Sequence, residues 1–324
     1  MYQLEIIDAS YYLPKNKVTS QEIEQNSKKL KTWIIQRLTW VKERYYRDDN
    51  EYPSTLASEA CKKLIQRNKN SIDLIIFAST SRDVSEPATG NIVQYLSWLD
   101  CPVFDVSNAC NSFLNWLDIA HLYISSWRCE NILLCSWETT SVAINWNTPH
   151  IKDFITWTTL WDAWAAFLLW RGNDQNKWIK YQFFSNKWEF WEDICVKWWW
   201  ARAPRTPEET YFKSHLESSM GYFQEAGLQP FLKWLEISWW TREDVDKVFF
   251  HQGGKILLDG LIKTTGLWEE KVITTFTNYW NTASASIPLA FALEKEKWNI
   301  KEWDKVIFIC PAAWLAYWII FIQL

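Results

Sequence analysis

Short runs of apolar, β-branched and aromatic residues recur along the chain, and most are separated from the next run by a longer segment with helical periodicity. Strand-length runs that alternate with helix-length segments are typical of an α/β fold with buried strands. The expected strands cover residues 74–80, 102–106, 131–136, 165–170, 247–252, 271–276, 305–310 and 319–324. The expected helices cover residues 54–67, 91–99, 111–126, 219–236, 254–265 and 284–297.

The two halves of the chain resemble each other. SIDLIIF resembles DVDKVFF, and RCENILLC resembles WDKVIFIC. Self-similarity at a spacing of about 170 residues favours duplication of one α/β unit over a short-period solenoid. We therefore expect two fused halves, residues 1–172 and residues 173–324. They should form one body, because no linker rich in Pro, Gly or Ser lies between them.

Charge and cysteine usage exclude several classes of protein. The net charge is −4, and no basic cluster exceeds Arg202 and Arg205, so the chain lacks the basic footprint of a nucleic-acid-binding protein. Seven cysteines without a CxxC pair argue against a disulfide framework and against a zinc site. Most lie in apolar runs, as expected for buried thiols in a reducing cytosol. We expect a cytoplasmic protein with no metal and, from the amino-terminal residues, no secretory signal.

The stretch 306–324 carries no charge and is long enough to span a bilayer. Pro311 and several small residues divide it into two strand-length pieces. Two buried strands joined by a tight loop are therefore the preferred interpretation, and no membrane span is expected.

Cys110 follows the expected strand 102–106 and a turn of small residues, at the start of the expected helix 111–126. A helix N-terminus offers unpaired N–H groups and a partial positive charge, which should stabilise a thiolate and lower the pKa of the thiol. The thiolate is the nucleophilic form, so this position suits an acyl-enzyme cysteine. A buried structural cysteine is the alternative.

Two further residues lie at comparable junctions. His251 ends the apolar run KVFFH, at the carboxyl end of a strand, where α/β folds bind ligands. Asn281 lies just before the expected helix 284–297. A core imidazole and a helix cap would explain each residue alone. Together, a Cys, a His and an Asn at three such junctions predict a catalytic set.

The motifs DVSNAC, FFHQGG and NTASASIP resemble the Cys, His and Asn motifs of type III ketoacyl-ACP synthases in the thiolase superfamily. The resemblance runs from SYYLPKNKV to the last strand pair. It implies an α/β fold of the thiolase type, duplicated, with five α-β-α-β-α layers, and it implies a homodimer. It also implies acyl transfer from acyl-CoA to Cys110, followed by Claisen condensation with a second thioester in lipid biosynthesis. The CoA thioester is a substrate, and no cofactor is implied.

The resemblance also assigns roles to residues. His251 and Asn281 would donate hydrogen bonds to the thioester oxygen that becomes enolate-like as the carbanion forms. The backbone N–H groups of Cys110 and Ala313 would form a second oxyanion site. Each such donor typically lowers the barrier by about 3 kcal/mol.

Glu86, in SRDVSEPAT, separates two branches of the superfamily. This segment resembles the one that supplies a glutamate to the partner subunit's site in OleA-type enzymes, which condense two acyl-CoAs head to head. A carboxylate suits removal of an α-proton from an unactivated thioester, whereas decarboxylation of malonyl-ACP needs no such base. A solvated loop charge is the alternative interpretation of Glu86.

Trp33 and Arg37 resemble the pair that holds the CoA adenine in type III synthases, by ring stacking and positive charge. One extra residue separates Trp33 from the next motif. The family's HQAN motif is HQGG here. The arginine used for docking of the carrier protein aligns near Ile256, with Lys255 and Lys263 as substitutes, and this departure favours plain CoA over an acyl carrier protein.

Three alternatives stay open. One is the OleA-type reaction with Glu86 as base. Another is a thioester hydrolase or acyltransferase, which needs the acyl-cysteine but no carbanion. The third is a non-catalytic acyl-binding relative, against which the intact set of Cys110, His251 and Asn281 argues.

The chain contains 26 Trp and only 8 Gly, although glycine is usually about 7% of residues. Many Trp fall where the resembled family has glycine. Glycine is used at such positions because it allows positive φ or the close approach of two backbone segments. These Trp residues are Trp116, Trp161, Trp164, the triplet at 198–200, Trp280, Trp314 and Trp318. The hypothesis is that most Trp other than Trp33 are glycines in the organism, encoded by a reassigned UGA codon. The rival is a Trp-rich protein with a blocked tunnel and no catalytic role.

Overall fold

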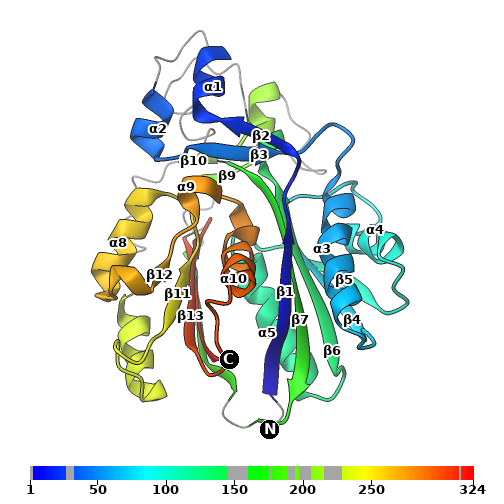
Figure 1. Ribbon diagram of the computed structural model, residues 1–324, viewed down its shortest axis with the longest axis vertical. Helices are drawn as coiled ribbons and strands as arrows, with labels where there is room; N and C mark the ends of the chain where they lie inside the picture. Colours follow the sequence, from blue (N-terminus) through cyan, green and yellow to red (C-terminus); the bar gives the residue numbers. More distant parts are fainter. Residues whose placement is uncertain are drawn as a thin grey trace.

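The computed structural model describes residues 3–26, 33–144, 160–174, 177–187, 194–196, 206–214, 228–279, 281–313 and 315–324. Two five-stranded sheets form its centre (Figure 1). The first has the strand order β1-β7-β6-β4-β5. These strands are β1 (Gln3–Tyr12), β4 (Leu74–Ala78), β5 (Val103–Val106), β6 (Asn131–Thr139) and β7 (Asp162–Gly172).

The second sheet repeats this arrangement in the order β8-β14-β13-β11-β12. Its strands are β8 (Trp178–Ser185), β11 (Lys247–Phe250), β12 (Val272–Ile273), β13 (Lys305–Ala312) and β14 (Ala316–Gln323). In each sheet the first two neighbouring pairs are antiparallel and the last two are parallel. The predicted duplication is confirmed. The exact boundary between residues 172 and 173, which falls in the β7–β8 connection, stays a prediction.

Helices lie on both outer faces and between the sheets (Figure 1). On the outer face of the first sheet lie α3 (Pro53–Arg67) and α4 (Thr89–Leu96). The outer face of the second sheet is covered by α8 (Lys255–Thr265) and by helical residues 228–238. Between the sheets lie α5 (Ser112–Ser125) and α10 (Ser286–Glu296). The predicted five-layer thiolase-type fold is confirmed.

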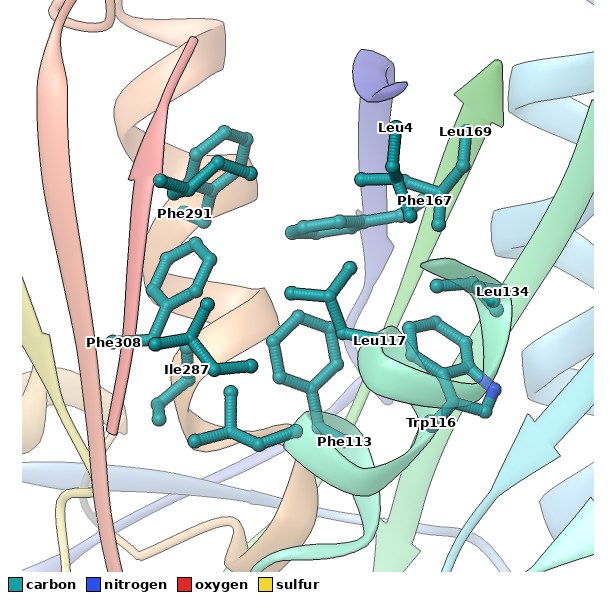
Figure 2. Packing of buried hydrophobic residues seen from close by; sticks show 14 of the residues in the cluster. Leu4, Phe113, Trp116, Leu117, Leu134, Phe167, Leu169, Ile287, Phe291 and Phe308 are labelled. Carbon is teal, nitrogen blue, oxygen red and sulfur yellow. The ribbon is translucent and has the colours of Figure 1, made fainter. Parts of the chain in front are cut away.

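The central layer is the most deeply buried part of the fold. Figure 2 shows Phe113 and Leu117 of α5 lying between residues of the first sheet and Phe308 on β13 of the second. The Phe113 ring makes edge contacts with Phe167 at 5.2 Å and with Phe308 at 6.1 Å between ring centroids. Because both sheets pack on α5, the loop that precedes this helix is fixed relative to both halves of the chain.

Smaller elements complete the described fold. A strand pair, β2 (Asn16–Thr19) and β3 (Glu43–Tyr46), carries α1 (Ser20–Asn26) and α2 (Ile34–Thr39) in its connection. A second short pair joins β9 (Ile194–Cys195) to β10 (Lys213–Ser214). Short helical turns are η1 (Thr140–Ala143), η3 (Pro207–Thr210), η4 (Glu269–Lys271), α9 (Phe276–Tyr279) and η5 (Ala283–Ala285).

The carboxyl-terminal apolar stretch forms the antiparallel pair β13–β14, as expected. The expected strand 271–276 is wrong beyond Ile273. There the Gln252 side chain accepts a hydrogen bond from the Thr275 backbone N–H at 3.2 Å, and α9 begins at Phe276. No described helix is long and apolar enough to cross a bilayer.

Tryptophan occupies positions of the backbone that favour glycine. Ten described residues other than glycine have positive φ, and seven of them are Trp. Five of these Trp end a helix in the left-handed conformation, as Gly266 does after α8 at φ 64°. Glycine is the usual residue there because it lacks a Cβ. The five are Trp40, Trp98, Trp127, Trp239 and Trp298.

Buried Trp residues are poorly accommodated as well. The indole N–H groups of Trp137, Trp161, Trp164 and Trp318 are buried without a hydrogen-bond partner among the described residues. The Phe77 and Trp137 ring centroids are 3.4 Å apart, closer than the 4.5–7 Å usual for aromatic pairs. Both observations fit glycine or another small residue better than an indole. The Trp triplet at 198–200, Trp280 and Trp314 lie outside the described residues.

Candidate active site

Cys110 lies in the tight turn between β5 and α5. Asn108 donates its backbone N–H to Ser112 Oγ at 2.8 Å, and that hydroxyl donates to the Ala109 carbonyl at 2.6 Å. Ala109 has φ 48°, so the chain bends sharply just before the cysteine. Because Ser112 is the first residue of α5, these bonds fix Cys110 directly before the central helix.

The surroundings of the Cys110 thiol favour its neutral form. Burial and the nearby Glu138 carboxylate raise the pKa of Cys110 to about 12. The backbone N–H groups of Ala313 and of Cys110 itself contact the sulfur and act in the opposite direction. The expected lowering of this pKa by the helix N-terminus is therefore wrong, because burial outweighs the amide contacts.

His251 directly follows β11 and is buried, with 4% of its surface exposed. Its backbone N–H donates to the Ile309 carbonyl at 2.9 Å, and its Nδ1 lies 3.1 Å from Ser286 Oγ. Burial lowers the pKa of His251 to about 4, although a hydrogen bond with the Ala283 backbone favours the charged form. The imidazole is therefore neutral near pH 7. A Cβ on Gly253 would lie 3.1 Å from Nε2, so glycine keeps this edge of the ring clear.

Asn281 lies in the loop before η5 and α10. Its Oδ1 accepts the Ala283 backbone N–H at 2.9 Å, and its carbonyl accepts the Trp161 backbone N–H at 3.1 Å. Because Oδ1 is used in this way, the Nδ2 group is the part of the carboxamide that can donate to a ligand.

The structure brings the predicted residues together around the carboxyl end of β13. Ala283 contacts both the His251 ring and the Asn281 side chain. Cys110 contacts the backbone of Ala313, and its carbonyl accepts a hydrogen bond from Cys310 Sγ at 3.2 Å. Since His251 is bonded to the residue that precedes Cys310, the three loops meet at one place.

Backbone strain is concentrated in the same loops. The three described residues with positive φ that are neither Gly nor Trp are Ala109, Ala283 and Leu315. They lie next to Cys110, two residues after Asn281 and two residues after Ala313. Left-handed φ costs a residue with a Cβ about 1–3 kcal/mol and clusters at functional sites.

Glu86 is exposed in a loop beside the edge of the first sheet. The backbone N–H groups of Thr89 and Gly90 both donate to the Asp105 carboxylate on β5 at 2.9 Å, which ties the loop to this edge strand. No hydrogen bond or ion pair among the described residues joins Glu86 to Cys110 of the same chain.

A cavity of about 590 Å³ lies beside α2. The two residues expected to bind CoA, Trp33 and Arg37, both line it. Lys255 lies nearby, with its Nζ 5.5 Å from the Trp40 ring centroid, but it is also paired with Asp259 at 2.7 Å. Lys263 lies in the last turn of α8. The full lining is Trp33, Gln36, Arg37, Trp40, Lys42 and Thr277.

Glu138, which was not predicted, is the last residue but one of the buried strand β6 and acts electrostatically on Cys110. A single acid at the end of the apolar run ILLCSWE is the signal that could have identified it. No group of three or more His, Cys, Asp or Glu residues in the described part of the chain could hold a metal ion.

Known proteins resemble the chain along most of its length. The family described as 3-oxoacyl-[acyl-carrier-protein] synthase III matches residues 104–187, and its C-terminal region matches residues 235–322. A beta-ketoacyl-[acyl-carrier-protein] synthase III of Clostridium perfringens is 28% identical over 317 residues, with 95% of each chain covered. Its counterpart from Rickettsia canadensis is 27% identical over 318 residues, with 96% of each chain covered.

Solved structures share the fold. The 3-oxoacyl-[acyl-carrier-protein] synthase III of Aquifex aeolicus superposes with a TM-score of 0.87 at 23% identity, covering 100% of both chains. A variant of OleA from Xanthomonas campestris superposes with a TM-score of 0.87 at 20% identity, covering 100% of this chain and 98% of the other.

Proposed function

The chain belongs to the 3-oxoacyl-[acyl-carrier-protein] synthase III family of condensing enzymes, and we propose that Cys110, His251 and Asn281 perform its carbon–carbon bond formation. The observation that carries this proposal is the convergence of their three loops at the end of β13.

Acyl transfer comes first. The Cys110 sulfur attacks the thioester carbonyl of acyl-CoA, the bond between that carbonyl carbon and the CoA sulfur breaks, and the thiol proton of Cys110 passes to the CoA sulfur, which leaves as a thiol. The negative oxygen of the tetrahedral intermediate accepts hydrogen bonds from the backbone N–H groups of Cys110 and Ala313. These amides already contact the sulfur, which supports their role in this step.

Condensation follows on the acylated cysteine. A second thioester becomes a carbanion by losing either carbon dioxide or an α-proton, and His251 and Asn281 donate hydrogen bonds to its enolate oxygen. The low pKa of His251 supports a neutral imidazole, which donates from Nε2 in this step, and Ser286 Oγ lies 3.1 Å from Nδ1. The carbanion attacks the acyl carbonyl, and the Cys110 thiolate leaves.

The second substrate divides this proposal into two branches. Malonyl-ACP is the first candidate, because the relatives are named for an acyl carrier protein. A second acyl-CoA, with Glu86 as the base, is favoured by the position of the Glu86 loop. That loop is tied to β5, an edge strand of four half-buried residues paired only with β4 among the described strands. Pairing of two β5 strands in a homodimer would bring Glu86 towards the partner's site.

Product analysis with the Glu86→Gln variant distinguishes the branches. Purified enzyme is offered acyl-CoA with and without malonyl-ACP, and products are identified by mass spectrometry. If Glu86 removes the α-proton, Glu86→Gln lowers head-to-head condensation by about a hundredfold or more, within the usual range for a general base. Decarboxylative condensation should persist, as should both reactions in the matched loop variant Asp83→Asn. Equal head-to-head activity in wild type and Glu86→Gln contradicts the role of Glu86, and no product from either substrate pair contradicts the proposed function.

Arg37→Ala tests the CoA cavity. Loss of one charged hydrogen bond to the nucleotide should raise KM for acyl-CoA about tenfold, while kcat should stay within about twofold, because the contact is the same in ground and transition states. Steady-state kinetics with acyl-pantetheine, which lacks the nucleotide, provide the control and should be unaffected. An equal rise in KM for both substrates would place the nucleotide elsewhere.

The cytoplasmic location expected from cysteine usage stays part of this proposal, as does the absence of a cofactor.

A further inference from the structure

Glu138 is a fully buried acid in the wall of the site. It lies near the carboxyl end of β6, with none of its surface exposed, and no basic side chain of the described residues is among its hydrogen-bond partners. Burial raises the pKa of Glu138, and its hydrogen bonds oppose that shift. A buried acid without a cationic partner is costly to keep, so its contacts need a physical explanation.

Four donors converge on this carboxylate. Oε1 accepts the Thr80 backbone N–H at 3.0 Å and the Ser284 hydroxyl at 2.5 Å, and Oε2 accepts the Thr80 hydroxyl at 2.5 Å and the Ser81 hydroxyl at 2.9 Å. The Ser81 oxygen also accepts the Thr139 backbone N–H at 3.1 Å, which directs its proton towards Glu138. A carboxylate can accept all four bonds, which fits its ionised form.

These donors come from segments far apart in the chain. Thr80 and Ser81 follow β4 and begin the loop that reaches Glu86, whereas Ser284 lies in η5 of the second half. Ser284 is the neighbour of Ala283, which contacts both His251 and Asn281. Glu138 therefore links the first half of the molecule to the loop that carries the carboxamide.

We propose that Glu138 is a positioning residue for condensation, which holds the Asn281 loop against the first half of the chain through Ser284. Two bonds to Thr80 and one to Ser81 fix the carboxylate, and the fourth fixes η5. The Asn281 side chain is fixed in turn by its bond to Ala283. This inference rests on the proposed function, since it assigns a role within the condensation step.

Substitution of Glu138 should slow condensation but not acyl transfer. Acyl transfer uses Cys110 and the amides of Cys110 and Ala313, none of which bonds to Glu138. Condensation also needs the enolate donors, and a loop displaced by a fraction of an ångström weakens such bonds. Glu138→Gln keeps the side-chain shape but replaces one acceptor oxygen with a donor, so at least one of the four bonds is lost.

The experiment measures the two half-reactions separately. In Glu138→Gln and in Ser284→Ala, condensation in single turnovers of acylated enzyme should fall about tenfold to a hundredfold, the range for loss of a hydrogen bond to a charged group. Acylation by radiolabelled acyl-CoA should fall by no more than about threefold. The double variant should be no slower than the slower single variant, because both substitutions break the same link.

A second readout follows the charge of Glu138. The rate of alkylation of Cys110 by iodoacetamide is measured against pH. Because the Glu138 carboxylate disfavours the thiolate, its removal should shift the profile of Glu138→Gln towards lower pH. Ser284→Ala should leave the profile unchanged, and so should Glu294→Gln, a control at another buried acid, which bonds to Lys297 and Asn299.

Several outcomes would overturn the proposal. Condensation at the wild-type rate in both single variants would do so, and so would an equal loss of acylation and condensation. If the rate losses of the two single variants multiply in the double variant, the two residues do not share one link. If Glu138→Gln does not fold, a wild-type condensation rate in Ser284→Ala alone would refute the proposal. If wild-type enzyme itself forms no condensation product, the proposed function fails, whereas a normal rate in the variants refutes only the role of Glu138.

Discussion

The Cys110→Ala variant is expected to take up no acyl group from radiolabelled acyl-CoA and to lose at least about a thousandfold in condensation rate. The reason is chemical. The Cys110 sulfur carries the acyl group in the covalent acyl-enzyme. Alanine removes this sulfur but keeps the backbone bend at Ala109, where φ is 48°. Labelling is measured by radioactivity retained on denatured protein and by peptide mass spectrometry.

Cys310→Ala is the matched control for this result. Cys310 is a second thiol in the same place, with its Sγ 3.2 Å from the Cys110 carbonyl, but it is fully buried in β13. Cys110 is only partly buried, so Cys310 is the less accessible of the two thiols to an acyl-CoA. Its variant should label normally. Labelling that survives in Cys110→Ala and disappears in Cys310→Ala would move the nucleophile to β13.

Replacing Trp by glycine at four helix ends is expected to raise the free energy of unfolding by about 4 kcal/mol. Each substitution should contribute about 1 kcal/mol, because glycine adopts the left-handed conformation without the strain that a Cβ causes. The four substitutions are Trp98→Gly, Trp127→Gly, Trp239→Gly and Trp298→Gly. Each indole is between 58% and 92% exposed, so little apolar burial is lost. Chemical denaturation of the quadruple variant and of wild type measures the difference.

Trp268→Gly is the control for the glycine series. Trp268 is 50% exposed but has φ −71°, so it bears no left-handed strain. Glycine there should destabilise the protein slightly, by about 0.5–1 kcal/mol, because it increases the freedom of the unfolded chain. A quadruple variant no more stable than wild type would contradict the strain argument. UGA codons at the helix-end positions, or glycine there in the protein isolated from its organism, would establish that these Trp are not native, whereas UGG codons would refute the hypothesis.

Much of the fold could be predicted because its central strands are buried on both faces and appear as continuous apolar runs. In the two five-stranded sheets the missed strands are β1 and β8, whose sequences QLEIIDASYY and WIKYQFFS mix polar and apolar residues, and the two short pairs β2–β3 and β9–β10 were missed as well. Polar residues interrupt both sequences, so neither forms a continuous apolar run. The strand at Val272–Ile273 was overextended because a side chain, Gln252, ends the ladder, and a distant side chain leaves no local signal.

The candidate active site, like the fold, could be predicted only in part. Cys110, His251 and Asn281 were predictable because each belongs to a short motif at a junction between elements. The charge state of Cys110 was not, because it depends on burial and on Glu138, which approaches the cysteine only after β6 and α5 pack together. The sequence around Cys110 indicates a helix N-terminus, but it does not contain Glu138, the carboxylate that raises the pKa of Cys110.

The repeated sheet topology has a consequence for how such a site can arise. Cys110 precedes α5 after the edge strand β5, and Asn281 precedes α10 after the edge strand β12, so the two side chains occupy equivalent places in the two repeats. In a symmetric pair of identical half-length chains those places must hold the same residue. Covalent fusion removes that constraint, and one place can then evolve into an electron-pair donor while its twin becomes a hydrogen-bond donor.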